Sequence, residues 1–195
     1  MHSTLRVSVA VAMVVSGCMT SAYGAPLIAE HIRFERPSLA PMAYTQFCLR
    51  YPGECRTATL FRGGPIKLSA SRKSEMTQVN QTVNSRIVPE ANLQGLAGEK
   101  WLINPARGDC NDYAVTKRHE LMARGWPARA LLLSEVVTSW GEHHLVLVVR
   151  AAEGDLVLDN LTDRIKPWLR VPYRWVRMQM PGVSRLWTTV ATRAV

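Results

Sequence analysis

Long hydrophobic runs, sequence repeats and blocks of like charge are absent from this 195-residue chain. Its N-terminal apolar stretch, residues 7–15, is well short of the roughly 20 residues that span a bilayer, and no later stretch supplies a span. Basic residues are scattered and form no arm or run. These absences exclude a transmembrane anchor and give no support to a nucleic-acid partner.

Acidic residues are also scarce, with 15 Asp and Glu against 24 Lys and Arg and a net charge of +9. Loss of residues 1–24 would remove only Arg6 and leave a net charge of +8. Because the positive charges are dispersed, we interpret them as general surface charge. The apolar content of 47% is ample for a core, so we expect residues 25–195 to form a single domain.

Residues 1–24 have the pattern of an export signal: one positive charge, a short apolar stretch and then small residues. Two processing routes fit this segment. Small residues at Ala22 and Gly24 suit cleavage after Gly24, whereas the residues before Cys18 resemble a lipoprotein signal that ends in a lipidated cysteine. We therefore expect a periplasmic or secreted protein, with a lipid anchor at Cys18 as the second route.

Only four cysteines are present, and they fall into three groups. Cys18 lies in the export signal, and Cys48 and Cys55 flank a Pro-Gly turn, where they can form a disulfide in an oxidising compartment. Cys110 has no such partner. An idle thiol is an oxidation liability in an exported protein, so Cys110 is the candidate nucleophile.

Hydrophobic periodicity predicts an α+β fold, in which helices precede several antiparallel strands. Residues 25 to about 72 are rich in Pro, Gly and Arg and predict an irregular segment that wraps the core. Apolar residues three and four apart predict a helix over 74–87, and a second helix is expected over 109–123. Strands are expected over 129–137, 143–150, 156–159 and 171–180.

Cys110 would lie in the first turn of the second helix, where the helix dipole favours a thiolate over a thiol. A base is then needed, and histidine suits that role because it titrates near neutral pH. Of the five histidines, one lies in the export signal, one in the irregular segment, and one roughly 13 Å along the same helix as Cys110. His143 and His144 remain, and strand alternation does not choose between them.

Asp159 is the candidate for the residue that orients the histidine, because it ends a strand that should return beside the histidine strand. If Glu153 and Gly154 are the two turn residues, Asp159 pairs with Val148, four residues from His144. A longer loop or a bulge would then be needed to bring them together.

Several motifs in this half of the chain occur in the order found in a known family. They are Gly-Asp-Cys-Asn-Asp-Tyr-Ala at 108–114 with Lys117, Gly-Trp-Pro at 125–127, the run from His144 to 149, and Asp-Leu-Val-Leu-Asp-Asn at 155–160. Over residues 90 to about 190 the chain resembles the bacterial transglutaminase-like cysteine proteinases, a group that includes the LapG-type periplasmic proteases.

The resemblance implies a papain-like, transglutaminase-like core in which the nucleophile begins a helix packed on an antiparallel sheet. It matches the family's catalytic triad to Cys110, His144 and Asp159, and it favours His144 over His143. The implied activity is hydrolysis of a protein substrate through a thioester, with a surface adhesin as the substrate by analogy. The chemistry itself requires no cofactor.

LapG-type proteins also bind calcium beside the cysteine, which the resemblance places at Asp109, Asn111 and Asp112. Asn111 departs from the acidic residue expected there. Two carboxylates beside Cys110 would oppose thiolate formation unless a cation or an arginine offset them. The alternative is that Asp109 caps the helix and Asp112 lies in its first turn.

Other functions use the same residues. A transglutaminase would pass the thioester to an amine, and a cell-wall amidase would cleave muropeptides. A non-catalytic module would use the basic surface to bind an anionic component of the envelope.

Overall fold

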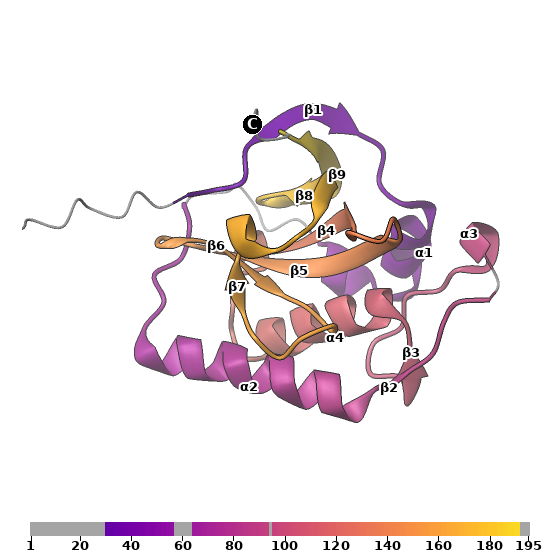
Figure 1. Ribbon diagram of the computed structural model, residues 1–195, viewed down its shortest axis with the longest axis horizontal. Coiled ribbons are helices and arrows are strands. Elements are labelled where there is room, and N and C mark those ends of the chain that lie inside the picture. The colour runs from indigo at the N-terminus through magenta and orange to yellow at the C-terminus, as the bar shows by residue number, and fades with distance from the viewer. Residues whose placement is uncertain (1–29, 57–63, 94, 192–195) are drawn as a thin grey trace, which may run out of the picture.

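A seven-stranded antiparallel sheet dominates the structure, a computed structural model that describes residues 30–56, 64–93 and 95–191 (Figure 1). Helices cover one side of this sheet, which confirms the α+β class. The predicted export signal and Cys18 lie outside the described residues. In sheet order the strands are β1 (Phe34–Ser38), β9 (Val183–Val190), β8 (Arg174–Met180), β4 (Leu131–Val137), β5 (His143–Ala151), β6 (Gly154–Leu158) and β7 (Lys166–Pro167).

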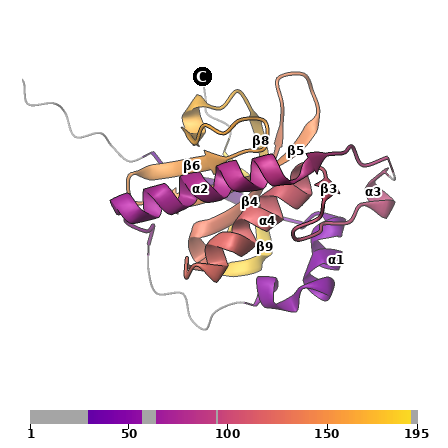
Figure 2. The ribbon, with the colours of Figure 1, turned by 90° about the horizontal axis from the view of Figure 1, so that it is seen from below.

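Helix α4 (Cys110–Ala123) lies between the sheet and helix α2 (Ala70–Arg86), as Figures 1 and 2 show from two directions. The apolar residues of β5 that face α4 are Leu145, Leu147 and Val149. Because α4 is the middle layer, it buries polar as well as apolar side chains, including Lys117 and Arg118. This burial of charge cannot be predicted from the periodicity of the helix.

Helix α2 packs on α4 through Met76, Val79 and Val83, whose spacing predicted this buried face. The helix begins at Ala70, four residues before the predicted start. Ser69 provides the cap, because its hydroxyl accepts a hydrogen bond from the Arg72 amide at 3.2 Å.

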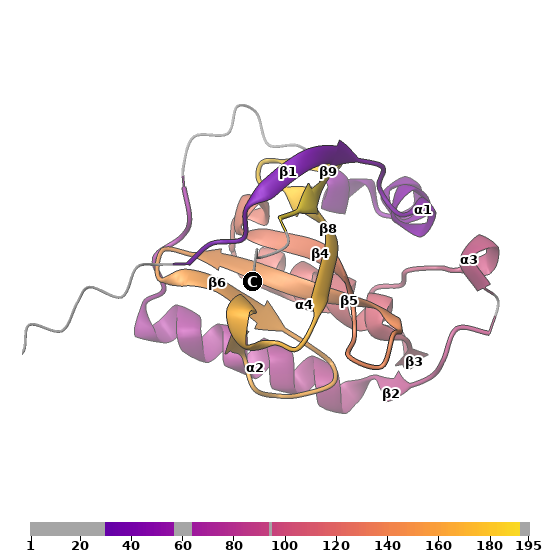
Figure 3. The ribbon, with the colours of Figure 1, turned by 45° about the horizontal axis from the view of Figure 1, so that its top comes forward.

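The segment before α2 is more regular than its composition predicted. Strand β1 pairs with β9 at one edge of the sheet (Figure 3), and helix α1 (Met42–Arg50) and a 3-10 helix, η1 (Pro52–Cys55), follow it. The prediction of an irregular segment over 25–72 is therefore wrong for these residues. The buried face of α1 consists of only Ala43, Tyr44, Phe47 and Cys48, which is too short a pattern to stand out among Pro and Gly.

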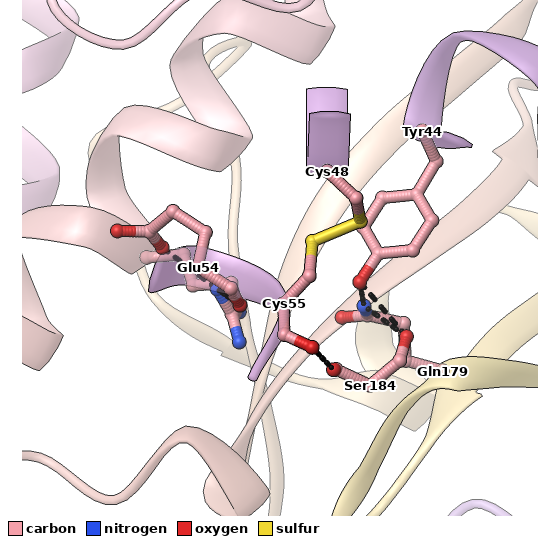
Figure 4. The surroundings of a disulfide bond; sticks show 7 residues. Tyr44, Cys48, Glu54, Cys55, Gln179 and Ser184 are labelled. Atoms are coloured by element: carbon pink, nitrogen blue, oxygen red, sulfur yellow. Dashed lines mark hydrogen bonds and ion pairs between the residues drawn. A yellow bond between two sulfur atoms is a disulfide. The ribbon is translucent and has the colours of Figure 1, made fainter. Parts of the chain in front are cut away.

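The disulfide predicted between Cys48 and Cys55 is present and joins α1 to η1 (Figure 4). Ser184 ties this unit to β9, since its hydroxyl donates to the Cys55 carbonyl at 2.9 Å. Glu54, between the cysteines, accepts a hydrogen bond from Arg118 of α4 at 2.8 Å. The disulfide thus holds η1 against both the sheet and the central helix.

The β5–β6 hairpin turns one residue earlier than predicted. Ala151 pairs with Gly154, so the two turn residues are Ala152 and Glu153, and Gly154 takes a positive φ of 121°. The predicted pairing of Asp159 with Val148 is therefore wrong, since Val148 pairs with Val157. The corrected register brings Asp159 two residues closer to His144.

The remaining elements are short. They are a parallel pair of strands, β2 (Val88–Pro89) and β3 (Arg107–Gly108), helix α3 (Gly95–Gly98), and two 3-10 helices, η2 (Ala128–Ala130) and η3 (Trp168–Arg170). In the part of the chain that the structure describes, no helix is long and apolar enough to cross a membrane.

Candidate active site

Cys110 is the first residue of α4, and a capping box fixes the helix start around it. The Asp109 side chain accepts from the Asn111 amide at 2.9 Å, and the Asp112 side chain accepts from the Asp109 amide at 3.1 Å. A Cβ atom at residue 108 would overlap the Asp112 carboxylate, so this close approach requires Gly108. The Gly-Asp-Cys order therefore has a structural reason.

The Cys110 thiol is half-buried and free, and the backbone amide of Leu145 donates a hydrogen bond to it. The Cys110 sulfur consequently lies beside the start of β5, at the residue that directly follows His144. Burial raises the pKa of Cys110 to about 12, and the carboxylates of Asp109, Glu99 and Asp159 act in the same direction. This is opposite to the effect expected from the helix dipole, because desolvation and negative charge outweigh the dipole and the Leu145 amide.

His144 and Asp159 form a buried pair, with 2.9 Å between His144 Nε2 and Asp159 Oδ1. The carboxylate also accepts from the Leu161 amide at 3.0 Å and from the Tyr173 hydroxyl. Burial alone would raise the pKa of Asp159, but these hydrogen bonds outweigh it and lower the pKa. Asp159 is therefore an ionised acceptor that fixes the orientation of the imidazole.

His143 lies on the other side of the strand, where 70% of its side chain is exposed. Its Nδ1 atom is 2.7 Å from Glu135 Oε1, and the same carboxylate pairs with Arg177. The structure thus brings His144 together with Asp159 and places His143 among surface charges.

Tyr173 belongs to this site although sequence reasoning gave it no role. Besides its hydrogen bond to Asp159, its ring lies edge-on to the His144 imidazole, with 5.7 Å between centroids. Asn84 of α2 supports the same loop, since its side-chain amide donates to the Asp159 carbonyl at 3.0 Å. Tyr173 follows Asp159 by 14 residues, and no spacing rule connects the two.

The residues suggested for calcium are close to Cys110 but already bonded to the protein. Both Asp112 oxygens accept backbone hydrogen bonds, from Leu102 at 2.7 Å and from Asp109, and the side-chain amide of Asn111 donates to the Glu99 carboxylate. Within the described residues, no three His, Cys, Asp or Glu side chains converge as a metal site. Burial, together with Asp109 and Glu99, raises the pKa of Asp112 to about 6. The carboxylates match the oxygen ligands that calcium prefers, and a cation would relieve their repulsion.

The site combines a cysteine at the start of a helix, an antiparallel sheet on which that helix packs, and a buried His–Asp pair beside the cysteine. Together these features define the class of transglutaminase-like cysteine peptidases. The family model of the bacterial transglutaminase-like cysteine proteinases, BTLCP, matches residues 35–194, and the chain belongs to this family. The protein is accordingly a cysteine peptidase, and its substrate is a protein.

Solved structures of LapG from Legionella pneumophila have a similar fold. The calcium-bound form has 22% identity and a TM-score of 0.54, and the match covers 66% of this chain and 76% of that one. Another LapG structure has 25% identity and a TM-score of 0.50, covering 60% and 68% of the two chains. An EGTA-treated form has 24% identity and a TM-score of 0.51, covering 66% and 72%. A search of the curated proteins found no match.

Proposed function

We propose that this chain is an exported peptidase that cleaves a protein of the cell envelope or surface, with Cys110 as nucleophile, His144 as base and Asp159 as the residue that orients the base. The observation that carries this proposal is the hydrogen bond between His144 and Asp159. His144 directly precedes Leu145, whose backbone amide donates to the Cys110 sulfur. The family relationship supports the activity, and the export pattern of residues 1–24 supports the location.

The proposed reaction begins with a neutral thiol, because the pKa of Cys110 is about 12. His144 Nε2 bonds to Asp159, which leaves Nδ1 to take the thiol proton as the sulfur attacks the peptide carbonyl. The backbone amide of Cys110, at the start of the helix, donates to the developing oxyanion.

Collapse of the tetrahedral intermediate breaks the C–N bond, and the imidazolium returns its proton to the leaving amine. The acyl group remains on sulfur as a thioester. His144 then deprotonates a water molecule, which attacks the thioester, releases the carboxylic acid and restores the thiol. Asp159 stabilises the imidazolium in both halves of the reaction.

The test is incubation of the mature protein with an envelope protein extract, followed by mass spectrometry of the products. The expected result is new peptide N- and C-termini with wild type and none with Cys110→Ala, although that variant folds normally by circular dichroism. Isopeptide crosslinks would identify a transglutaminase, and cleaved muropeptides with intact proteins would identify an amidase. An unchanged protein pattern would favour a non-catalytic module.

The export part of the proposal is separable from the chemistry. Cleavage after Gly24 leaves an N-terminus at residue 25, whereas lipidation leaves an acylated Cys18. The intact mass of the protein recovered from an expressing bacterium distinguishes these products, and an unprocessed Met1 terminus in the cytoplasm would contradict export.

A calcium ion near Cys110 is the finer part of the proposal, and it is supported by the existence of a calcium-bound form of the similar LapG. Asp109 and Asp112, with Glu99 in addition to the predicted Asn111, are the residues that would hold it. Calorimetry should detect binding in wild type and at least about tenfold weaker binding in Glu99→Gln. Glu90→Gln is the matched control, because Glu90 pairs with Arg107 at the surface. Equal affinity in both variants would remove Glu99 from the site.

A further inference from the structure

Lys117 is the least expected residue in the interior of α4. Its side chain is only 1% exposed, although lysine is almost never fully buried without a partner. It follows Cys110 by seven residues, so the two lie on the same face of the helix, about 10 Å apart along the axis. The Lys117 side chain therefore lies about two helical turns after Cys110, on the same side of α4.

The Lys117 ammonium makes no direct hydrogen bond within the described residues. Its Nζ atom is buried and lies 5.9 Å from the centroid of the Tyr113 ring. A buried charge without a hydrogen-bonded partner is costly, and an apolar side chain of similar length would fill the same space. Packing alone therefore does not account for a lysine at this position.

The charged groups that face Lys117 come from the turn after β6. Asp159 and Asp163 both attract its ammonium. Asn84 holds this turn in place, because its amide donates to the Asp159 carbonyl and, at 2.8 Å, to the Asp163 carboxylate. Of the residues that the structure describes, the buried ones of α2 are Met76, Val79, Asn80 and Val83, and those of β5 in the shared core are Leu145, Leu147, Val149 and Ala151, none of which is titratable.

Asp159 itself is faced by groups from three other elements. His144 lies on β5, Tyr173 precedes β8, and Lys117 lies on α4. Among these, Lys117 carries the positive charge before the reaction, when the imidazole must be neutral to act as a base. Burial lowers the pKa of Lys117 to about 7, and the two carboxylates oppose this shift, so the ammonium predominates below neutral pH and is about half populated at pH 7.

We propose that Lys117 is a positioning residue of the active site, whose buried ammonium acts together with the hydrogen bonds from His144, Tyr173 and Leu161 to keep Asp159 ionised, so that the carboxylate holds the His144 imidazole ready for Cys110. This inference rests on the proposed roles of Cys110, His144 and Asp159. It adds a fourth ionisable group that contacts neither the thiol nor the substrate and acts through Asp159.

The first test is NMR titration of the lysine side chains in the mature protein, which requires no activity. Electrostatic coupling is reciprocal, so Asp159→Asn should lower the pKa of Lys117 by about half a unit or more. The exposed lysines in the same spectrum serve as internal controls, and their titration curves should not change. An unchanged Lys117 titration in Asp159→Asn would overturn the inference.

The second test compares Lys117→Met with Lys117→Arg. Removal of the positive charge favours protonation of the His144–Asp159 pair, so the acid limb of the kcat/KM profile should move to higher pH in Lys117→Met by about half a unit or more. Lys117→Arg retains the charge and should keep the wild-type limb. Lys117→Met should unfold at the same or a higher temperature, because it removes an unpaired buried charge.

These outcomes separate the inference from the proposed function. If the activity requires Cys110 but the acid limb of the kcat/KM profile is the same in wild type and in Lys117→Met, only the role of Lys117 is overturned. Activity that survives in Cys110→Ala would overturn the proposed function, while the NMR titration would still measure the coupling of Lys117 to Asp159. If Lys117→Met fails to fold, the titration in Asp159→Asn decides the question.

Discussion

His144 Nε2 lies 2.9 Å from Asp159 Oδ1, although the two residues are not paired across the β5–β6 ladder. The ladder ends where Leu147 pairs with Leu158, so Asp159 is the first residue beyond it and His144 lies three positions before Leu147. The imidazole therefore reaches the Asp159 carboxylate diagonally. The Tyr173 hydroxyl and the Leu161 amide also donate to this carboxylate. The orientation of His144 therefore depends on groups that lie far apart in the sequence.

Replacing His144 should abolish most of the peptidase activity. Loss of the general base in His144→Ala is expected to lower kcat/KM by about 10²- to 10⁴-fold. His143→Ala is the matched control and should remain within about twofold of wild type, since His143 pairs with Glu135 at the surface. Peptide cleavage assays check both. A comparable loss in His143→Ala would mean that the adjacent histidine is the base.

Removing the Tyr173 hydroxyl should lower activity without unfolding the protein. Tyr173→Phe deprives Asp159 of one hydrogen bond, so we expect about a tenfold lower kcat with a nearly unchanged KM. The pKa of Asp159 should rise, which moves the acid limb of the pH–rate profile upward.

Tyr113→Phe is the matched control for Tyr173→Phe. The Tyr113 hydroxyl donates to the Ile87 carbonyl and not to Asp159, so this variant should lose stability by about 1 kcal/mol and keep its kcat. A kcat equal to wild type in Tyr173→Phe would show that the tyrosine does not position the catalytic pair.

The Cys110 thiol should react slowly with alkylating agents at neutral pH. Its pKa of about 12 is raised above the ordinary value, so the protonated thiol predominates at every pH below that point. The rate of iodoacetamide alkylation should rise about tenfold per pH unit from pH 6 to 10, whereas an ordinary thiol levels off near pH 9. Circular dichroism at each pH ensures that the fold persists. A plateau below pH 8 would mean that the resting protein contains an activated thiolate.

Loss of the disulfide should destabilise the fold more than loss of the free thiol. Cys48 and Cys55 close a short loop, for which the chain-entropy relation predicts about 2–3 kcal/mol. Urea unfolding of the double Cys-to-Ser variant should show this decrease in the free energy of unfolding. Cys110→Ser keeps the disulfide and should lie within about 1 kcal/mol of wild type. Equal stability of the two variants would contradict a structural role for the disulfide.

Much of the fold could be predicted because it depends on local patterns. The spacing of Met76, Val79 and Val83 predicted the core helix, and the aliphatic run after His144 predicted the central strand. The fold class and the family followed from the order of these elements and from the motif around Cys110. Strand β9 and helix α1 escaped prediction, since short or mixed segments take their structure from long-range pairing and burial.

By itself, the sequence determined the order of the elements α2, α4, β4, β5, β6 and β8, the pairing of Cys48 with Cys55 and the position of Cys110 at a helix start, because periodicity, cysteine spacing and capping are local properties. Only the tertiary structure decided that His144 bonds to Asp159, that Lys117 is buried, and that the pKa of Cys110 rises instead of falling. The reason is physical: ionisation and side-chain contact depend on desolvation and on charges brought together from distant segments.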